Sequence, residues 1–364
     1  AEDGIRDYKV TGVQTCALPI SGEKLVSRGC THPLPAFTLQ PPGRSLTVPN
    51  HPVSSIPSAG RNCTQRPSGG AKPAVTEFLQ LLVSGLSQGC VYGLIALGFV
   101  LIYKATELVN FAQGDIMMFG AFFAYTFLDV LAWPFVPGLL ATLVVMAIFG
   151  VILERVFMRR MIGEPPFATL MLTIGLGFLL RAVAGAIWGS DPRSVTTPYA
   201  GEVVQIGGVV MGYENIAIMV GTVTLCVVLY LFFRFSRVGI AMQATSENQL
   251  AAYFVGIPVK RIFSLVWAIS AMIAALAGAL IAPISLVEPQ LGFLGVKAFA
   301  AAIVGGFGSL PGAIIGGLVV GVAEQFAGLY LPPGFSDTVA YLILLLVLVV
   351  RPEGLFSTMQ RKKV

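Results

Sequence analysis

The chain has 364 residues, of which 55% are hydrophobic and 11% are charged, and its mean hydropathy is +0.82. A soluble domain carries about 25% charged residues, so this composition indicates a protein dominated by membrane-spanning segments. Eight of the 23 Lys and Arg residues and four of the 18 Asp and Glu residues lie in the first 74 positions. The net positive charge therefore belongs mainly to that segment, and it does not support binding to nucleic acid.

The chain opens with AEDGIRDYKVTGVQTCALPI. This stretch lacks the basic start, the apolar run of about 7–15 residues and the small-residue cleavage site of a secretory signal. Residues 1–7 and 10–20 instead resemble the fixed parts of a translated DNA-sequencing adapter, with Tyr8-Lys9 where the variable index falls. We expect residues 1–20 to be an assembly artefact, fused in frame to translated upstream DNA, and the native start to be Val75.

Residues 21–74 are rich in Pro, Ser, Gly and Thr and show no helical or strand periodicity. Such a segment buries too little apolar surface to offset its ordering entropy, so we expect residues 1–74 to be disordered and non-native, and 75–364 to form one transmembrane domain. Both histidines and three of the five cysteines lie before position 75. The transmembrane domain therefore offers no histidine for hydrolytic catalysis or metal binding, no disulfide framework is expected, and no metal site is predicted.

Apolar runs of about 20 residues can cross the hydrocarbon core of a bilayer. The sequence predicts an all-α polytopic protein with about eight or nine transmembrane helices, some of them interrupted by glycine. The expected segments are 78–103, 112–132, 136–157, 167–189, 214–235 and 262–283, a Gly-broken pair at 296–306 and 312–330, and a last segment at 338–350.

Lys and Arg residues predict the orientation, because they concentrate in cytoplasmic loops. One set of loops holds twelve of them, and the opposite set holds only Arg193 and Lys297. The larger set is Lys104, Arg155, Arg159, Arg160, Arg234, Arg237, Lys260, Arg261, Arg351, Arg361, Lys362 and Lys363. We therefore expect a cytoplasmic C-terminus and an external loop over residues 190–213.

A polar turn, Asn110-Phe111-Ala112-Gln113-Gly114-Asp115, follows a Gly-rich apolar segment. At membrane depth, such a turn suits a broken helix whose end lines a cavity, so Asn110, Gln113, Gly114 and Asp115 are candidate pathway residues. The alternative is a capped cytoplasmic turn beneath Lys104, with Asp115 at a helix start.

Residues 82–125, with this turn, resemble the branched-chain amino acid permease subunits of ATP-binding-cassette (ABC) importers, of the LivH type. Gln113 and Asp115 stand where that family usually has His and Glu. The resemblance extends over 76–357 through three further motifs, which are GSDPRSV at 189–195, GGFGSLPGA at 305–313 and RPEGLFS at 351–357. Ser357 replaces a family Gly.

The resemblance implies a transport subunit in the bacterial inner membrane that binds no cofactor itself. Its partners would be a related LivM-type permease, two cytoplasmic ABC ATPases that use ATP and magnesium, and a periplasmic amino-acid-binding protein. The chain contains no G-x-x-x-x-G-K-[ST] phosphate-binding loop, so we expect no ATPase or other enzymatic activity of its own.

The segment 236–261 reads as a short helix from about Ile240 to Val255, stopped by Gly256 and Pro258. By resemblance, it is a coupling helix that docks on the ATPase. Its site residues would be Glu247, Ala251, Ala252 and Gly256. The alternative is a solvated connector with basic flanks.

Glycines spaced four apart around 305–321 predict close helix packing in lipid. Gly305, Gly306, Gly308 and Ser309 are also candidates for the pathway. Charges inside spans mark function by default, so Arg181 and Glu324 are singled out, with snorkelling to the surface as the alternative and mutual pairing left open.

Two other functions remain as alternatives. A urea or short-amide permease of the same superfamily would share the fold. An ion-coupled secondary transporter would require inverted repeats and intramembrane carboxylates, and carboxylates are few here.

Overall fold

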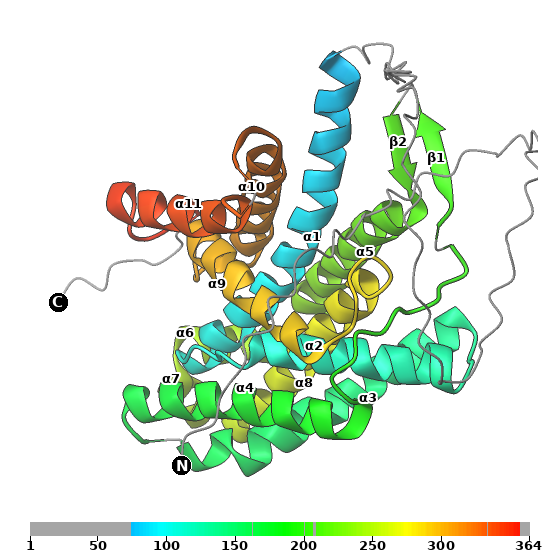
Figure 1. Cartoon of the computed structure of the whole chain (residues 1–364). Helices are drawn as coiled ribbons and strands as arrows, with labels where there is room; N and C mark the ends of the chain where they lie inside the picture. Colours follow the sequence, from blue (N-terminus) through cyan, green and yellow to red (C-terminus); the bar gives the residue numbers. More distant parts are fainter. Residues whose placement is uncertain (1–73, 162, 200, 207–208, 333, 357–364) are drawn as a thin grey trace, which may run out of the picture. The chain divides into compact units, whose positions relative to one another are not determined.

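The computed structural model describes residues 74–161, 163–199, 201–206, 209–332 and 334–356 (Figure 1). The chain divides into the units Ala1–Arg66 and Pro67–Val364, and the described residues belong to the second. The expectations about an adapter-derived segment and about disorder concern residues 1–74, of which 1–73 lie outside the described residues and Ala74 is helical. The three basic residues at 361–363 also lie outside the described residues.

Helices account for most of the described chain, and their bounds are as follows. They are α1 Ala74–Thr106, α2 Gln113–Tyr125, α3 Phe135–Val156, α4 Pro166–Trp188, α5 Tyr213–Phe235, α6 Arg237–Glu247, α7 Gln249–Phe254, α8 Val259–Ile281, α9 Leu294–Gly305, α10 Leu310–Tyr330 and α11 Ser336–Val350. A π-helical turn, Thr126–Val130, continues α2, and the 3₁₀ turns Met158–Met161 and Pro289–Phe293 follow α3 and precede α9. The all-α class is confirmed.

A β-hairpin lies between α4 and α5. Its strands are β1 Val203–Ile206 and β2 Val209–Gly212, which pair antiparallel with Val204 opposite Met211. The hairpin contacts α1 as well as α5, so it sits at the end of the bundle where α1 begins. We refer to this end as the hairpin end (Figure 1).

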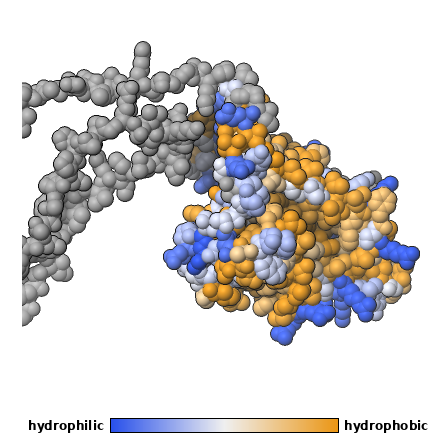
Figure 2. Space-filling view, turned by 90° about the vertical axis from the view of Figure 1, so that its right-hand side faces the viewer, coloured by the Kyte–Doolittle hydropathy of each residue, from blue (hydrophilic) through white to orange (hydrophobic). Residues whose placement is uncertain are grey.

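Within the part of the chain that the structure describes, six helices are long and apolar enough to cross a membrane, namely α1, α3, α4, α5, α8 and α10. The other three expected crossings are shorter helices, since α2, α9 and α11 have 13, 12 and 15 residues. Figure 2 shows hydrophobic residues over much of one face, with hydrophilic residues clustered toward its margins. Proline marks several helix starts, because Pro134, Pro165 and Pro258 stand directly before α3, α4 and α8.

The end opposite the hairpin gathers the basic residues of the longer loops. Gln249 of α7 donates a hydrogen bond to the carbonyl of Ala105, next to Lys104 at the end of α1. Arg159 lies against Lys260, because its guanidinium donates to the Lys260 carbonyl over 3.5 Å. Arg234 lies in the last turn of α5, which leads into α6. We call this the basic end.

Helix α1 is central, and glycine lets it approach α10 closely. A Cβ on Gly89 would lie 2.7 Å from Leu318 Cα, and one on Gly317 would collide with the backbone of Gly93. A second glycine row on α10 faces a different helix, since a Cβ on Gly316 would collide with the Ala301 carbonyl of α9. The glycine spacing therefore reflects two packing seams, which join α10 to α1 and to α9.

The seam between α1 and α10 gives a stability prediction. Gly317→Ala places a methyl group against the Gly93 backbone, so we expect it to destabilise the fold by about 1–3 kcal/mol, as overpacking does. Gly175→Ala is the matched control, because it also lies within a helix but a Cβ there meets nothing within 4 Å. Unfolding free energies in mixed micelles test this, and equal stabilities of the two variants would contradict the packing argument.

Candidate functional site

The turn between α1 and α2 lies inside the bundle. Asn110 and Gln113 are 1% and 0% exposed, and Asp115 is 3% exposed. Asn110 shapes the turn locally, because its side-chain oxygen accepts a hydrogen bond from the Ala112 amide over 3.1 Å. This burial favours the interior interpretation of the turn over a solvated cap beneath Lys104, although Asp115 does stand in the first turn of α2.

A hydrogen-bond network holds Gln113 in place. Ser270 of α8 donates from its hydroxyl to Gln113 Oε1 over 3.2 Å and to the Gly98 carbonyl of α1 over 3.1 Å. Gln113 Nε2 in turn faces the Ser270 carbonyl at 3.4 Å. Any Cβ on Gly98 would collide with the Gln113 amide, so the glycine makes room for this side chain. The network joins the start of α2 to α1 at Gly98 and to the middle of α8.

Asp115 forms an ion pair with Arg181 of α4. Arg181 Nε lies 2.6 Å from Asp115 Oδ1, and the side chains are 18% and 4% exposed. The guanidinium carbon also lies 3.7 Å from the centre of the Phe293 ring. Two opposite charges in contact avoid the large cost of an isolated charge in an apolar interior. Asp115 therefore anchors α2 to α4.

Glu324, the other charge singled out in the sequence, has different partners and does not pair with Arg181. Lys297 of α9 donates to Glu324 over 2.6 Å and to Asp337 of α11 over 2.7 Å. The Tyr92 hydroxyl of α1 donates to Glu324 over 2.7 Å. This cluster links α1, α9, α10 and α11 toward the hairpin end.

The second set of pathway candidates forms the turn between α9 and α10. Ser309 caps α10, because its hydroxyl oxygen accepts from the Gly312 amide over 3.1 Å. Gly306 has a φ of 99°, which favours glycine, and the Leu355 and Phe356 amides bind the carbonyls of Val304 and Gly305. The RPEGLF tail thus covers this turn.

The structure keeps the two candidate sets apart. The hydrogen bonds of Gly305, Gly306 and Ser309 run within α9, α10 and their connection and to the Phe356 amide. The link is aromatic, since the Phe299 ring lies 5.0 Å from Phe111 and 5.7 Å from Phe307. Whether either set contacts a transported molecule stays a prediction.

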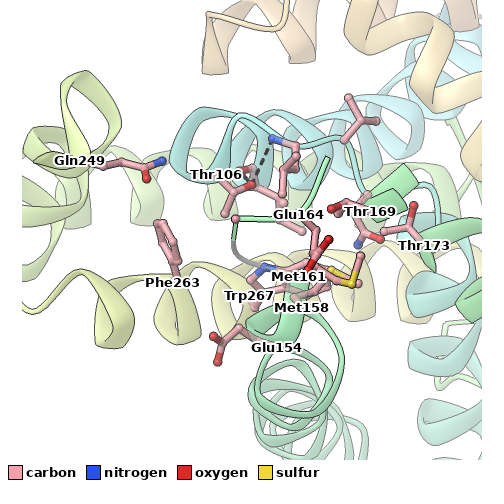
Figure 3. A pocket seen from close by; sticks show the side chains of 15 residues that line it. Thr106, Glu154, Met158, Met161, Glu164, Thr169, Thr173, Gln249, Phe263 and Trp267 are labelled. Atoms are coloured by element: carbon pink, nitrogen blue, oxygen red, sulfur yellow. Dashed lines mark hydrogen bonds between the residues drawn. The ribbon is translucent and has the colours of Figure 1, made fainter. Parts of the chain in front are cut away.

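A cavity of about 210 Å³ lies at the basic end, beneath the 110–115 turn (Figure 3). It is enclosed by the α1–α2 connection, the end of α3 with its following turn, and the starts of α4, α7 and α8. Its lining residues are Ile102, Thr106, Leu108, Val109, Asn110, Glu154, Met158, Met161, Gly163, Glu164, Thr169, Thr173, Gln249, Phe263 and Trp267. Asn110 is the one sequence candidate among them.

Glu154 is fixed beside this cavity by a clamp between α3 and α8. Arg159 donates to both Glu154 oxygens, over 3.1 and 2.9 Å, and the Ser264 hydroxyl donates to Glu154 Oε2 over 2.6 Å. Glu154 is only 2% exposed, so the bidentate pair neutralises a buried carboxylate.

The expected coupling helix is two helices, which corrects the prediction of one helix from Ile240 to Val255. Asn248 breaks it, because its side-chain oxygen accepts from the Ala251 amide over 2.9 Å and thereby caps α7. The predicted stop at Gly256 is confirmed by its φ of 93°. Glu247, Ala251 and Gly256 are exposed, whereas Ala252 is buried against the bundle.

Sequence reasoning missed the apolar surface of α7. Leu250, Tyr253, Phe254 and Val255 are 66–82% exposed, next to one another on a short helix at the basic end. Exposed apolar patches commonly mark interaction sites. The signal was present in the sequence as a cluster of large apolar residues, at 250 and 253–255, in the connection between two spans.

A family of known transport proteins matches most of the chain. The family described as "Branched-chain amino acid transport system / permease component" matches residues 81–348. This chain belongs to that family.

Individual proteins of known name are similar to this chain over 63–80% of its length. The high-affinity branched-chain amino acid transport system permease protein BraD of Pseudomonas aeruginosa is 35% identical, over 80% of this chain and 100% of BraD. LivH of Escherichia coli is 31% identical, over 79% of this chain and 98% of LivH. The fructose import permease protein FruG of Bifidobacterium longum is 26% identical, over 63% of this chain and 71% of FruG.

The chain is therefore a multi-pass membrane protein, a permease component of the ABC transporter type that is not itself the catalytic subunit. The resemblance to the LivH type is confirmed. Among solved structures, PsaBC from Streptococcus pneumoniae in complex with Fab matches over 79% of this chain and 98% of that chain, with a TM-score of 0.43 and 15% identity.

The Asp115–Arg181 pair gives a prediction about the start of α2. Arg181→Met leaves Asp115 as an unpaired, buried charge, so we expect a loss of about 1–3 kcal/mol in unfolding free energy, below the 3–5 kcal/mol of a fully buried pair because Arg181 is partly exposed. The double variant Asp115→Leu with Arg181→Met should recover most of that loss. Denaturant titration in micelles measures both, and a double variant less stable than Arg181→Met would contradict the pairing role.

Proposed function

We propose that this chain is a transmembrane permease subunit of an ABC importer for branched-chain or related hydrophobic amino acids, in a bacterial inner membrane. The observation that supports this most is its relation to BraD, which covers all of BraD at 35% identity. In this proposal the chain binds no cofactor, while two partner ATPases use ATP and magnesium. A related second permease and a periplasmic binding protein complete the transporter.

The basic end faces the cytoplasm in this proposal, and the hairpin end faces the periplasm. The distribution of Lys and Arg supports this, because Lys104, Arg159, Arg234 and Lys260 all lie at one end. With this orientation, α6 and α7 would lie on the cytoplasmic side, where the ATPase subunits would bind.

Helices α6 and α7 are the proposed coupling segment. A partner groove would receive the exposed side chains of α7, Leu250, Tyr253, Phe254 and Val255, as an apolar helix face docks in a groove. Gln249 ties the start of α7 to Ala105, so a movement of the ATPases would be passed to the end of α1. Alternating access would follow from that movement.

Two alternatives predict different behaviour. A urea or short-amide permease would share the fold and the partners but would transport a different solute. FruG, which is 26% identical, is named a fructose import permease, so proteins similar to this chain carry names of different substrate classes.

The other alternative, an ion-coupled transporter, would work without ATPases. The intramembrane carboxylates Asp115 and Glu324 are both paired with cations here, which leaves neither as a free ion ligand in this conformation.

Uptake measurements test the function. We expect proteoliposomes with this chain, its partner permease, both ATPases and the binding protein to accumulate leucine, isoleucine or valine only with ATP. Omitting the ATPases should abolish uptake. Uptake by this chain alone in a proton or sodium gradient would overturn the proposal, and ATP-driven uptake of urea but not leucine would favour the amide alternative.

The docking role of α7 has its own test. Phe254→Asp should reduce co-purification of the ATPases at least tenfold, because large aromatic side chains dominate interface energies. Tyr330→Asp at the hairpin end is the control, since Tyr330 and Phe254 are 76% and 78% exposed. Both variants should insert normally by protease protection. Unchanged ATPase recovery with Phe254→Asp would remove α7 from the interface.

A further inference from the structure

We propose that the cavity at the basic end is a binding site for a free branched-chain amino acid from the cytoplasm, through which accumulated product slows transport. The inference rests on the proposed function for its orientation and for its choice of ligand. The cavity itself, its size and its lining are properties of this single chain.

The cavity opens at the basic end and ends beneath the start of α2. Its exposed lining residues are Gly163, Glu164 and Gln249, whereas Asn110, Thr169 and Thr173 are at most 2% exposed. Beyond Asn110, the side chains of Gln113 and Ser270 fill the interior with hydrogen bonds. A molecule in the cavity would therefore enter and leave from the cytoplasmic side.

The size of the cavity limits the ligand. At about 210 Å³ it is smaller than the pockets of about 300–1,000 Å³ that hold drug-sized ligands. It exceeds the engineered apolar cavity of about 150 Å³ that holds benzene. The volume of a single free amino acid fits a cavity of this size, whereas that of a nucleotide or a long acyl chain does not.

The lining matches an aliphatic zwitterion. Apolar side chains such as Ile102, Val109 and Trp267 suit a branched alkyl group. Among the described lining residues there is no Lys or Arg, and the exposed Glu164 carboxylate favours an ammonium group over an added anion. Glu154 contributes less, because Arg159 already neutralises its carboxylate. The Thr169 hydroxyl and the second amide hydrogen of Gln249 can donate to the ligand carboxylate. The other two threonine hydroxyls of the lining already donate to backbone carbonyls.

A buried hydroxyl in the cavity lining, that of Thr169, has no hydrogen-bond partner among the described residues. Thr169 is 2% exposed. Buried polar groups are normally paired, and leaving one unpaired is unfavourable. Thr142 is equally buried but donates to the Gly138 carbonyl over 2.9 Å. The contrast points to a ligand for the Thr169 hydroxyl.

The cavity also touches the coupling segment, which gives binding a consequence. Gln249 is the first residue of α7, lines the cavity and holds α7 to Ala105. A ligand there stabilises the conformation that has the cavity, and it shifts the population away from the others. Transport must leave that conformation in each cycle, so occupancy slows the cycle.

Direct binding tests the site. The complex of this chain with its co-purified partners, in nanodiscs without binding protein, should bind radiolabelled leucine saturably, with one site for each copy of this chain. Unlabelled valine should compete, whereas lysine and urea should compete at least tenfold more weakly. Absence of saturable leucine binding would overturn the proposal.

Matched variants locate the site. Thr169→Val removes one hydroxyl and should weaken leucine binding about three- to tenfold, the range of a single hydrogen bond. Glu164→Gln, at an exposed position that folding tolerates, should also weaken it. Thr142→Val should leave binding unchanged. Leucine binding that is insensitive to both cavity variants would overturn the assignment.

Feedback is measured separately, so that the two proposals fail in different ways. Leucine on the ATPase side, at its dissociation constant, should reduce binding-protein-stimulated ATP hydrolysis about twofold, and Thr169→Val should shift this inhibition to higher leucine concentration. ATP-driven uptake of leucine without such inhibition would overturn the feedback role and leave the transport function intact. Leucine binding to the complex without any amino acid uptake would instead contradict the transport function.

Discussion

Each charged or amide side chain that this fold takes into its interior has to find a partner within the chain, and this requirement determines where α2 begins. The helix starts inside the bundle, where Gln113 bonds to Ser270 and Asp115 pairs with Arg181. In hydrocarbon, backbone that departs from helix is tolerated only where protein buries it or a cavity adjoins it. The polar turn before α2 meets both conditions, since it is buried and Asn110 lines the cavity.

The same requirement explains why the small residues lie where they do. Gly98 leaves room for the Gln113 amide, and Gly177 and Gly292 leave room for the Asp115 carboxylate. Other glycines act on the backbone alone, as Gly89 and Gly317 do between α1 and α10. Glycine therefore has two uses in this chain, which are to accommodate buried polar groups near α2 and to bring long helices together around α1.

The sequence predicts the features that depend on local pattern. Long apolar runs locate α1, α3, α4, α5, α8 and α10, and the glycine spacing of four indicates close packing on α10. It does not predict partners across the bundle, because Asp115 and Arg181 are 66 residues apart, and Lys297 and Asp337 are 40 apart. From the sequence, Arg181 and Glu324 remained a possible ion pair. The structure shows that Arg181 pairs with Asp115 and Glu324 with Lys297. The break at Asn248 was not predicted, because Asn is tolerated within a helix and only the structure shows that its side chain caps α7 instead.

The structural connection between the interior and the basic end runs through α1. The Gly98 carbonyl of α1 binds Ser270 in the network around Gln113, and the Ala105 carbonyl at the end of α1 binds Gln249 of α7. Both contacts use backbone oxygens of one continuous helix, and the glycine seam with α10 keeps that helix close to its neighbour. If α7 moved and α1 bent to follow it, the close backbone contacts between α1 and α10 would be disturbed. Packed helices shift between discrete arrangements rather than deform continuously, so we expect α1 to move as a unit. The cavity lies between these two contacts, with Asn110 at its inner end and Gln249 at its mouth, so its volume changes whenever α7 and the start of α2 move relative to each other.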